Sequence, residues 1–411
     1  MSMTTHERLR VVDLSMGWAG PLVGAMLSEM GAEVIKIEDT RHFDWWRGSL
    51  SMGAPEEHPI ERSAVFNSVN RGKLGVTLNL ADPRGVEVLK RLAVTADVLI
   101  ENYSVGVMER LGLSYRVLSA LNPRLVMISM PSFGAEGPES DARGYGNTVE
   151  AMAGVTGLTG YHDGGQPYTL SNALGDPVGG LNGMFAVMVA LHERERTGRG
   201  QWIELAQVEA AIPLMAEALL DYQLTGKIPP PHGNRHPRHA PHGIYRCAGE
   251  DNWIAVGVES EAQWRALLGV LGLERLAADP RFATAEARKR NEDALDDALS
   301  HAFASRETEE VARRLIRAGV PAGQVNSAPA VMADEQLQAR GYFVPVERAI
   351  VGTHLYPGAV ARFSQTPLET DRPAPLLGEH NRVVLREVLG MSDAEMEALE
   401  SAGIIGTRPL G

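Results

Sequence analysis

The stretch 172–180 carries the residue best suited to covalent chemistry, the carboxylate of Asp176. Asp176 precedes Pro177 between glycines, just ahead of the apolar run 181–191, which is typical of a helix start. We expect Asp176 to be the N-cap and Pro177 the first helical residue. Free backbone N–H groups and the helix dipole would then keep the carboxylate ionised near neutral pH. Two roles stay open: Asp176 only caps the helix, or it is a nucleophile that attacks an acyl group.

Four basic residues are candidates for binding an anionic ligand. Arg47, Lys73, Arg110 and Arg143 lie in or beside loops that follow expected strands. In an open parallel sheet, ligands bind beyond the carboxyl ends of the strands. Any one of these side chains can be a solvated charge, whereas the set supplies the counter-charges that a phosphorylated ligand requires.

Short apolar runs alternate with helical patterns in the N-terminal half of the chain, and these elements must position the candidate residues. The expected strands span 9–14, 32–38, 75–80, 97–101, 124–130 and 201–205. The expected helices span 22–30 (opened by Pro21), 82–94, 114–121 and 207–224, with a loop-rich region at 131–168. Strands that alternate with helices of this length predict crossover connections and a mostly parallel sheet.

The turn after the first expected strand does not match a dinucleotide-binding fingerprint. Its glycines, Gly17, Gly20 and Gly24, follow G-x-x-G-x-x-x-G rather than G-x-G-x-x-G. Glu38 ends the second strand as a ribose-binding acid would, but the turn spacing disfavours a nicotinamide cofactor. The chain also lacks the G-x-S-x-G elbow of serine hydrolases and the P-loop pattern that binds nucleotide phosphates.

A stretch rich in Pro, Gly, His and Arg at 226–241 separates a second module from the first. The sequence pattern of this module predicts strands at 243–246 and 253–258, followed by helices at 262–271, 288–304 and 308–318. The histidines of this stretch and its border are His232, His236, His239 and His242. No Cys or acid stands at ligand spacing among them, so a metal site is disfavoured. A surface loop or a ligand-facing loop is favoured instead, and in the second case Asn234, Arg235 and the histidines are the candidates for binding an anion.

Length, charge and cysteine content restrict the class of protein. A chain of 411 residues predicts two domains. The longest apolar run, 184–191, is too short to span a bilayer, and no signal-peptide pattern precedes it. The net charge of -13 argues against a nucleic-acid partner. A single cysteine, Cys247, excludes an internal disulfide, which fits a reducing compartment, so we expect a cytoplasmic protein. Because the apolar runs are short, we expect no membrane partner.

Several stretches in order along nearly the whole chain resemble the family III CoA-transferases, which include formyl-CoA transferase and the carnitine and bile-acid CoA-transferases. Each motif alone is weak, but the ordered combination is specific. The matching segments are 12–14 with 19–21, 31–38, 66–73, 97–103, 110–112, 175–176, 197–201, 233–237 and 375–380.

The resemblance implies a large doubly wound, Rossmann-like α/β domain built from both chain ends, a smaller inserted α+β domain, and an interlocked homodimer. The implied domains are 1–224, 225–332 and 333–411, the last returning to the large domain. The catalytic aspartate of the family falls at Asp176. Its CoA contacts fall at Trp18, Ala19, Asp39, Lys73, Asn102, Tyr103, Arg110, Arg143 and Tyr145. Coenzyme A and acyl-CoA are implied as substrates, with no tightly bound cofactor and no metal.

Two departures from the family concern the acyl site. Formyl-CoA transferase has Gln where this chain has Trp18, and four glycines in its lid where this chain has 232–242. Formate and oxalate specificity is therefore not implied. Trp18, together with Met16, Trp45 and Trp46, indicates an acyl pocket that is less polar than formate requires.

The resemblance favours CoA transfer from an acyl-CoA to a carboxylic acid, through an aspartyl anhydride and an aspartyl-CoA thioester on Asp176. Two alternatives remain: an acyl-CoA racemase of the same fold and a CoA-binding protein without catalysis. The racemase branch needs a histidine base opposite the aspartate. Tyr145 occupies that position here, and the nearest histidine is His162. Transfer is therefore favoured over racemisation.

Overall fold

The computed structural model describes residues 8–48, 57–170 and 173–410. By its internal contacts the chain divides into two compact units, which are considered separately. The first comprises 1–155, 169–216 and 338–411, and the second comprises 156–168 and 217–337. The second unit thus includes 156–168, a segment that the expected domain limits assign to the large domain.

A six-stranded parallel sheet organises the first unit. Its strands are β1 (Arg10–Asp13), β2 (Glu33–Glu38), β3 (Leu74–Thr77), β4 (Val98–Glu101), β5 (Val126–Ser129) and β6 (Trp202–Glu204). They lie in the order β3-β2-β1-β4-β5-β6, with Val12 of β1 paired to Ile35 and Leu99. This order is that of a doubly wound fold, so the predicted Rossmann-like sheet is confirmed. The strand order reverses between β1 and β4, where ligands bind in such folds.

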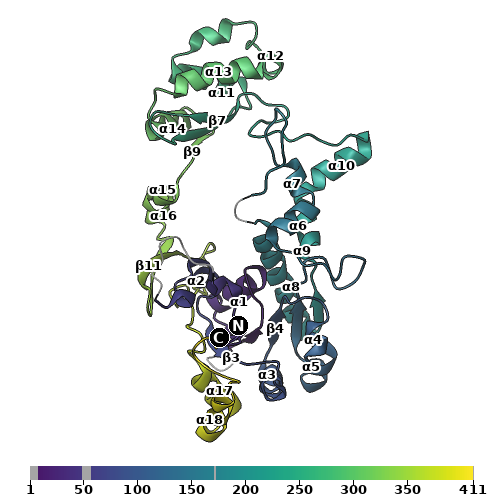
Figure 1. Cartoon of the computed structure of the whole chain (residues 1–411). Helices are drawn as coiled ribbons and strands as arrows, with labels where there is room; N and C mark the ends of the chain where they lie inside the picture. The colour runs from purple at the N-terminus through teal and green to yellow at the C-terminus, as the bar shows by residue number, and fades with distance from the viewer. Residues whose placement is uncertain (1–7, 49–56, 171–172, 411) are drawn as a thin grey trace. The chain divides into compact units, whose positions relative to one another are not determined.

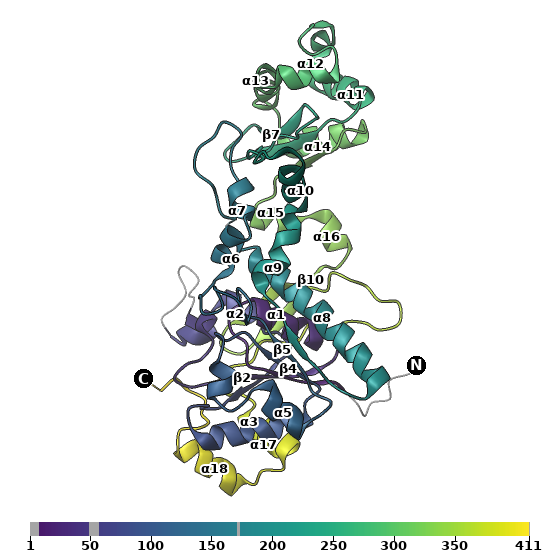
Figure 2. The same cartoon turned by 90° about the vertical axis from the view of Figure 1, so that its right-hand side faces the viewer.

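Helices cover both faces of the sheet (Figures 1 and 2). One face packs against α1 (Ala19–Glu29) and α8 (Gly175–Thr197), and the other against α3 (Pro83–Thr95), α5 (Tyr115–Leu121), α17 (Asn381–Leu389) and α18 (Asp393–Ser401). Side chains alternate between the two cores, since Val11 points to the first and Val12 to the second. Strands buried on both faces explain the continuous apolar runs in the sequence.

The C-terminal segment completes the sheet domain beside β3. The backbone N–H of His380 donates to the Gly75 carbonyl at 2.8 Å, and that of Thr77 donates to Asn381 Oδ1 at 2.8 Å. The predicted use of both chain ends is therefore confirmed. The other elements of this unit are α2 (Ala64–Val69), α4 (Val107–Arg110), α6 (Gly146–Met152), α9 (Gln207–Ala211), β10 (Phe343–Arg348), β11 (Gly352–Pro357) and the 3-10 helices η1 (Trp45–Gly48), η2 (Pro59–Glu61) and η3 (Ile212–Met215).

Proline positions account for two differences from the predicted helices. Helix α1 begins at Ala19, so Pro21 lies within its first turn, where no N–H partner is required. The single helix expected at 207–224 is instead α9, η3 and α10 (Ala216–Thr225). The break falls at Pro213, which cannot donate the hydrogen bond that a continuous α-helix needs.

The second unit is a small α+β domain, as predicted. Its antiparallel sheet consists of β7 (His242–Arg246), β8 (Trp253–Gly257) and β9 (Ala322–Gln324). Its helices are α11 (Glu261–Leu271), α12 (Ala285–Arg290), α13 (Glu292–Phe303) and α14 (Thr308–Arg317), with η4 (Glu274–Ala278) between α11 and α12. Trp264, Leu299 and Phe303 are buried in its separate core. Short helices α7 (Val155–Leu158), α15 (Ala328–Ala333) and α16 (Glu335–Ala339) lie near the unit limits.

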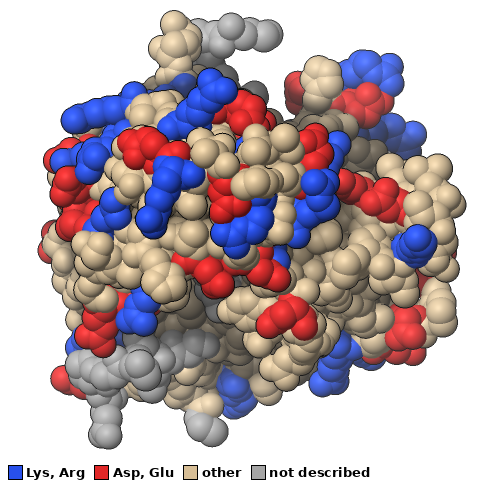
Figure 3. All heavy atoms as spheres, turned by 90° about the horizontal axis from the view of Figure 1, so that it is seen from above, with Lys and Arg blue, Asp and Glu red and all other residues tan. Residues whose placement is uncertain are grey.

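The face of the molecule shown in Figure 3 carries basic and acidic side chains interspersed. Within the described residues, no helix is both long enough and apolar enough to cross a membrane.

Candidate active site

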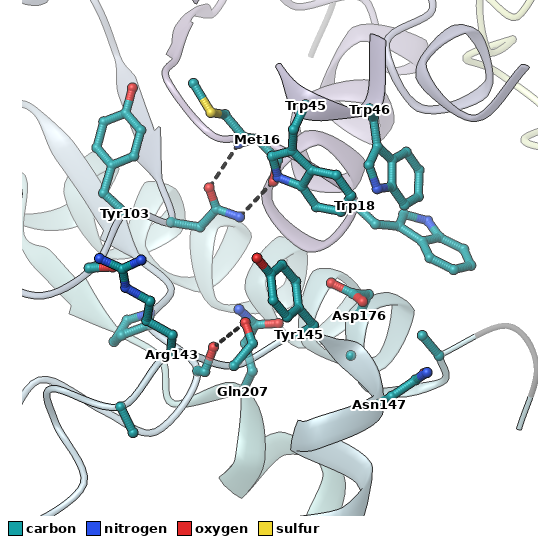
Figure 4. Close-up of a pocket in the computed structure, with 18 of the residues that line it drawn as sticks. Met16, Trp18, Trp45, Trp46, Tyr103, Arg143, Tyr145, Asn147, Asp176 and Gln207 are labelled. Carbon is teal, nitrogen blue, oxygen red and sulfur yellow. Dashed lines mark hydrogen bonds between the residues drawn. The ribbon is translucent and has the colours of Figure 1, made fainter. Parts of the chain in front are cut away.

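A cavity of about 680 Å³ lies beyond the carboxyl ends of β1, β2, β4 and β5 in the first unit. Its walls come from the loops that follow these strands and from the starts of α6, α8 and α9. They include Met16, Trp18, Trp45, Trp46, Asn102, Tyr103, Arg143, Tyr145, Asn147, Asp176 and Gln207. Figure 4 shows the indole rings on one side of the Asp176 carboxylate and Tyr145 beside it, with Arg143 nearer to Tyr103. The cavity is therefore placed where the sheet topology predicts a ligand site.

Asp176 occupies the first turn of α8 but is not its N-cap, so the sequence prediction of a capping role is wrong. The helix begins at Gly175 with Leu174 as the N-cap residue, and Pro177 is the third helical residue rather than the first. A Cβ on Gly175 would lie 2.9 Å from the Gly146 carbonyl oxygen. The helix starts two residues earlier than predicted, at Gly175, which fits closely against α6, and the Asp176 side chain is directed at the cavity.

The N-terminal ends of two other helices, α1 and α6, face the Asp176 carboxylate. The backbone N–H groups of Ala19, the first residue of α1, and Gly146, the first residue of α6, both donate hydrogen bonds to it. A Cβ on Gly146 would lie 2.2 Å from Asp176 Oδ2, so this approach is open only to glycine. The positive ends of α1 and α6 thus meet at one partly buried carboxylate.

Burial dominates the acidity of Asp176. The pKa of Asp176 is raised to about 6: loss of solvent is the largest cause and the nearby Glu150 carboxylate adds to the rise, whereas the N–H groups of Ala19 and Gly146 lower the pKa. The backbone N–H groups favour the ionised form, as expected, but burial outweighs them, so the net pKa is raised. The carboxylate is still mostly ionised at pH 7, while its basicity exceeds that of an exposed aspartate, which favours nucleophilic attack.

Aromatic side chains form the wall opposite Asp176. The ring centroids of Trp18 and Trp46 are 5.5 Å apart, and those of Trp45 and Trp46 are 5.7 Å apart in an edge-to-face arrangement. Trp45 also meets Tyr145 edge to face at 6.0 Å. Such pairs add about 0.5–1.5 kcal/mol each to the energy of apolar burial. All the residues that the sequence assigns to a less polar pocket, including Met16, line this cavity.

A buried ionic network holds this aromatic wall. Asp44 accepts hydrogen bonds from the backbone N–H groups of Gly17 and Trp46 at 3.1 and 3.0 Å, and its other oxygen pairs with Lys36 at 3.0 Å. The Lys36 ammonium also donates to the Ser15 carbonyl. The loop after β1 and the 3-10 helix η1 are thus fixed to each other through one carboxylate and one ammonium.

The sequence pattern that defines CoA-transferase family III matches residues 7–381, which is nearly the whole chain. The chain belongs to this family. It is therefore an enzyme of the CoA-transferase class, as the sequence resemblance predicted.

Named CoA-transferases are similar to this family III chain over nearly its full length. It is 32% identical to succinyl-CoA–D-citramalate CoA-transferase of Chloroflexus aurantiacus over 97% of this chain and 98% of that protein. It is 35% identical to succinate–glutarate CoA-transferase of Agrobacterium fabrum over 92% of this chain and 94% of that protein. A solved CAIB/BAIF family protein from Brucella suis superposes with a TM-score of 0.84 at 34% identity, covering 94% and 99% of the two chains. The fold is therefore that of the family.

Of the residues predicted for CoA binding, five line the cavity: Trp18, Asn102, Tyr103, Arg143 and Tyr145. The Asn102 amide accepts from the Met16 N–H and donates to the Met16 carbonyl, both at 2.8 Å (Figure 4). It therefore joins the loops after β1 and β4, and its amide atoms are engaged within the protein.

The other predicted contacts lie outside the cavity walls. Ala19 is buried beneath Asp176, while Arg110 is exposed and Asp39 accepts the backbone N–H of Arg41 at 3.1 Å. Lys73 is buried, and its three N–H donors go to Asp13, Pro21 and Asn70 at 2.7 to 2.8 Å. A ligand would have to displace one of these partners, so the proposed role of Lys73 as a direct CoA contact is not kept.

Arg47 does not serve the anion role predicted for it. Its buried guanidinium donates to Glu38 and Glu61, each at 2.8 Å. In the second unit, Arg235 pairs with Asp293 at 2.6 Å and Asp296 at 2.8 Å, so it is also neutralised. These two arginines stabilise their own units.

The histidine loop lies in the second unit. His236 packs against His239 and His242 with ring centroids 4.5 and 5.6 Å apart, and burial beside these rings lowers its pKa. No cluster of His, Cys, Asp or Glu suited to a metal ion occurs in the part of the chain that the structure describes.

Sequence reasoning missed Gly146, Glu150 and Gln207. Gly146 and Glu150 belong to α6, which lies inside the region predicted to be loop-rich. The signal available was one helical turn, with Val149 and Ala153 both buried and four residues apart. Gln207 opens α9, and its amide donates to the Met130 carbonyl at 2.9 Å. Short helices of this kind give weak patterns because they are stabilised by packing rather than by length.

Proposed function

We propose that this protein transfers CoA from an acyl-CoA to a free carboxylic acid, with Asp176 as the nucleophile. The observation that carries the proposal is the Asp176 carboxylate itself. It faces an aromatic cavity, accepts the N–H groups of Ala19 and Gly146, and has a pKa raised to about 6 by burial. The chain's membership of CoA-transferase family III supports the reaction class.

The proposed exchange begins when an Asp176 oxygen attacks the thioester carbonyl of the donor. The carbon–sulfur bond breaks, CoA leaves as the thiolate, and Asp176 becomes one half of a mixed anhydride. The thiolate then attacks the aspartyl carbonyl, which releases the donor acid as a carboxylate and leaves an aspartyl-CoA thioester. The acceptor carboxylate repeats both steps in reverse and regenerates Asp176. Each step exchanges one acyl bond for another and needs no oxidant or reductant.

Backbone N–H groups are suited to the charge that develops in these steps. Two of the four attacks convert the aspartyl carbonyl into a tetrahedral oxyanion. The N–H groups of Ala19 and Gly146, which donate to the resting carboxylate, are directed at the same oxygens. Donors fixed before the reaction stabilise such an oxyanion without reorganisation. The tryptophan wall covers one side of the carboxylate with apolar surface, which reduces the access of water to the anhydride.

The relatives indicate which acids to test first. The C. aurantiacus and A. fabrum proteins are named for succinyl or succinate with citramalate or glutarate. We therefore propose a short dicarboxylic acid as one exchange partner. Among the described residues that line the cavity, Arg143 is the cationic one, and we assign it to the CoA phosphates.

The proposal includes the homodimer and the cytoplasmic location expected from the sequence. In the isolated chain, α8 exposes Leu181, Phe185 and Val189 at 55%, 71% and 50%, spaced four residues apart on one helix face. A second copy that covers this apolar face would explain its composition. Sedimentation equilibrium should give twice the chain mass, and a monomer at micromolar concentration would contradict this part.

Mass spectrometry after incubation with a panel of acyl-CoAs tests the nucleophile directly. Succinyl-CoA, glutaryl-CoA and an apolar acyl-CoA are mixed with enzyme and trapped with hydroxylamine or borohydride. We expect an adduct on the peptide that contains Asp176, formed with at least one donor. Acid exchange is then followed by the appearance of acceptor acyl-CoA.

The Asp176→Asn variant separates the proposal from its alternatives. Asn keeps the size and hydrogen-bonding oxygen of the side chain, so a folded variant is expected, with kcat lowered at least about 10³-fold. Retained transfer would exclude Asp176 as the nucleophile. Exchange of the α-proton with deuterated water, without an adduct, would instead indicate a racemase, although none of the described cavity-lining residues is a histidine. Binding of CoA with neither activity would indicate a binding protein.

A further inference from the structure

A second carboxylate lies behind Asp176 and has no role in the steps above. Glu150 of α6 is 1% exposed. One of its oxygens accepts the backbone N–H of Gly175, the first residue of α8, at 3.3 Å. The other oxygen is buried with no hydrogen-bond partner among the described residues. A buried carboxylate normally has its oxygens satisfied, so an unpartnered one requires a functional explanation.

On the basis of the proposed function, we propose that Glu150 is a positioning residue of the active site. Through Gly175 it fixes the turn that carries Asp176, and its free oxygen places a buried negative charge beside the nucleophile. Glu150 does not line the cavity, so it acts through Asp176 and not on the substrate.

The charge of Glu150 favours the acylated forms of Asp176 over the resting form. Two carboxylates close together in a partly buried site repel each other while both are ionised. The anhydride and the aspartyl-CoA thioester are uncharged at Asp176, so acylation removes the repulsion. The same repulsion makes the resting carboxylate more basic, which agrees with the effect of Glu150 on the pKa of Asp176.

The other elements packed against α8 bring no comparable charge to Asp176. Helix α1 contributes Glu29, which pairs with Arg71 at 2.8 Å, and α9 contributes Glu209. Arg143 and Tyr145 face the same cavity from the loop before α6. Of these groups, Glu150 is the one whose charge shifts the pKa of Asp176. Its removal is therefore the selective way to change this electrostatic environment.

The test compares the pH dependence of wild-type enzyme and Glu150→Gln. Gln keeps the oxygen that accepts from Gly175 and removes the charge. We expect the acid limb of the kcat/KM profile to move to lower pH. At a fixed donor concentration, the fraction of enzyme trapped as Asp176 adduct should also fall. A residue that only supported the fold would move neither quantity in this direction.

Glu101→Gln is the matched control. Glu101 is also a buried glutamate of the first unit, 6% exposed, and accepts one backbone N–H, that of Tyr103 at 2.9 Å. It does not contribute to the pKa of Asp176, so its variant should keep the wild-type acid limb. If the Gln variant at 150 does not fold, Glu150→Met removes the charge together with the acceptor for the Gly175 N–H, in a side chain of similar volume, and the acid limb should again move to lower pH.

A folded Glu150 variant with an unchanged acid limb and unchanged adduct fraction would overturn the positioning role. That result would leave the nucleophile in place, because wild-type enzyme would still form the adduct. Absence of any adduct in the wild-type enzyme would instead overturn the proposed function, so the two failures are distinguishable.

Discussion

Two groups of buried charges in the first unit differ in how they are neutralised. Beneath the tryptophan wall, Asp13 pairs with Lys73 at 2.7 Å and Asp44 pairs with Lys36 at 3.0 Å. At the start of α8, the Asp176 carboxylate faces backbone N–H groups and another carboxylate, with no cation among the groups that shift its pKa. The first group is built from complete ion pairs, and the second is left unbalanced.

The difference shows in the acidity of the two aspartates. Burial raises the pKa of Asp13, but Lys73 and Lys36 outweigh it and hold the pKa below its usual value. Burial raises the pKa of Asp176 to about 6, and no cation reverses the effect. Paired charges in this protein therefore fix loops, while the unpaired carboxylate remains available for chemistry.

The same substitution at the two aspartates should have opposite effects on stability. Asp13→Asn leaves the buried Lys73 ammonium without its carboxylate partner, and loss of one partner of a buried pair costs about 3–5 kcal/mol. We expect the free energy of unfolding at pH 7.5 to fall by that amount, measured by urea denaturation. A change below 1 kcal/mol, on the order of a surface pair, would show that the network is not structurally important.

Asp176→Asn is the other half of this comparison. The pKa of Asp176 in the folded protein, about 6, exceeds the usual 3.8, so the folded state binds this proton more tightly than the unfolded state does. The stability that the proton contributes is complete below pH 3.8 and is lost as the pH rises through 6. Ionised Asp176 thus opposes folding at pH 7.5. Because the carboxylate is partly exposed, Asn should stabilise the protein by only about 1–2 kcal/mol there. The gain should disappear near pH 4. A destabilised variant at pH 7.5 would contradict the assignment of Asp176 to the unbalanced group.

Gly146→Ala tests the close fit around Asp176. The added Cβ would meet Asp176 Oδ2 at 2.2 Å and Ala173 Cβ at 2.6 Å, so the carboxylate must move. A displacement on the order of 1 Å at a reacting group costs about 10²-fold in rate. We expect kcat to fall by about that factor. Gly269→Ala, which has nothing within 4 Å of the added Cβ, should retain wild-type activity. Equal activity of the two variants would show that the position of Asp176 tolerates change.

Most of the sheet was predictable because strands β1 to β5 are buried on both faces. The run 9–14 predicted β1, and 97–101 predicted β4, each within one or two residues of the observed strand. The sequence also singled out Asp176, from a proline and glycines in a helix-start pattern and from the family resemblance; Asp176 lines the cavity, and its role as nucleophile stays a prediction. Local propensity and burial act on short segments, so a single sequence records them.

Interactions between distant segments could not be predicted in the same way. The pKa of Asp176 depends on Gly146, Ala19 and Glu150, which are far from it in the sequence. Whether a basic residue meets a ligand or an internal partner depends on the packing of several strands. Lys73 and Arg143 are both basic loop residues, yet one is fully paired inside the protein and the other lines the cavity.

The return of the C-terminus to β3 affects the order of events during synthesis. Leu385, Met396 and Leu399 complete the core on one face of the sheet, but β3 precedes α17 by about 300 residues. At about 5–20 residues per second, the ribosome needs roughly 15–60 s to make this stretch. During that interval the nascent sheet has one incompletely covered face, while the second unit, which lies wholly within the intervening chain, has all of its own core residues. The segment translated in the middle can therefore finish folding before the domain that was started first.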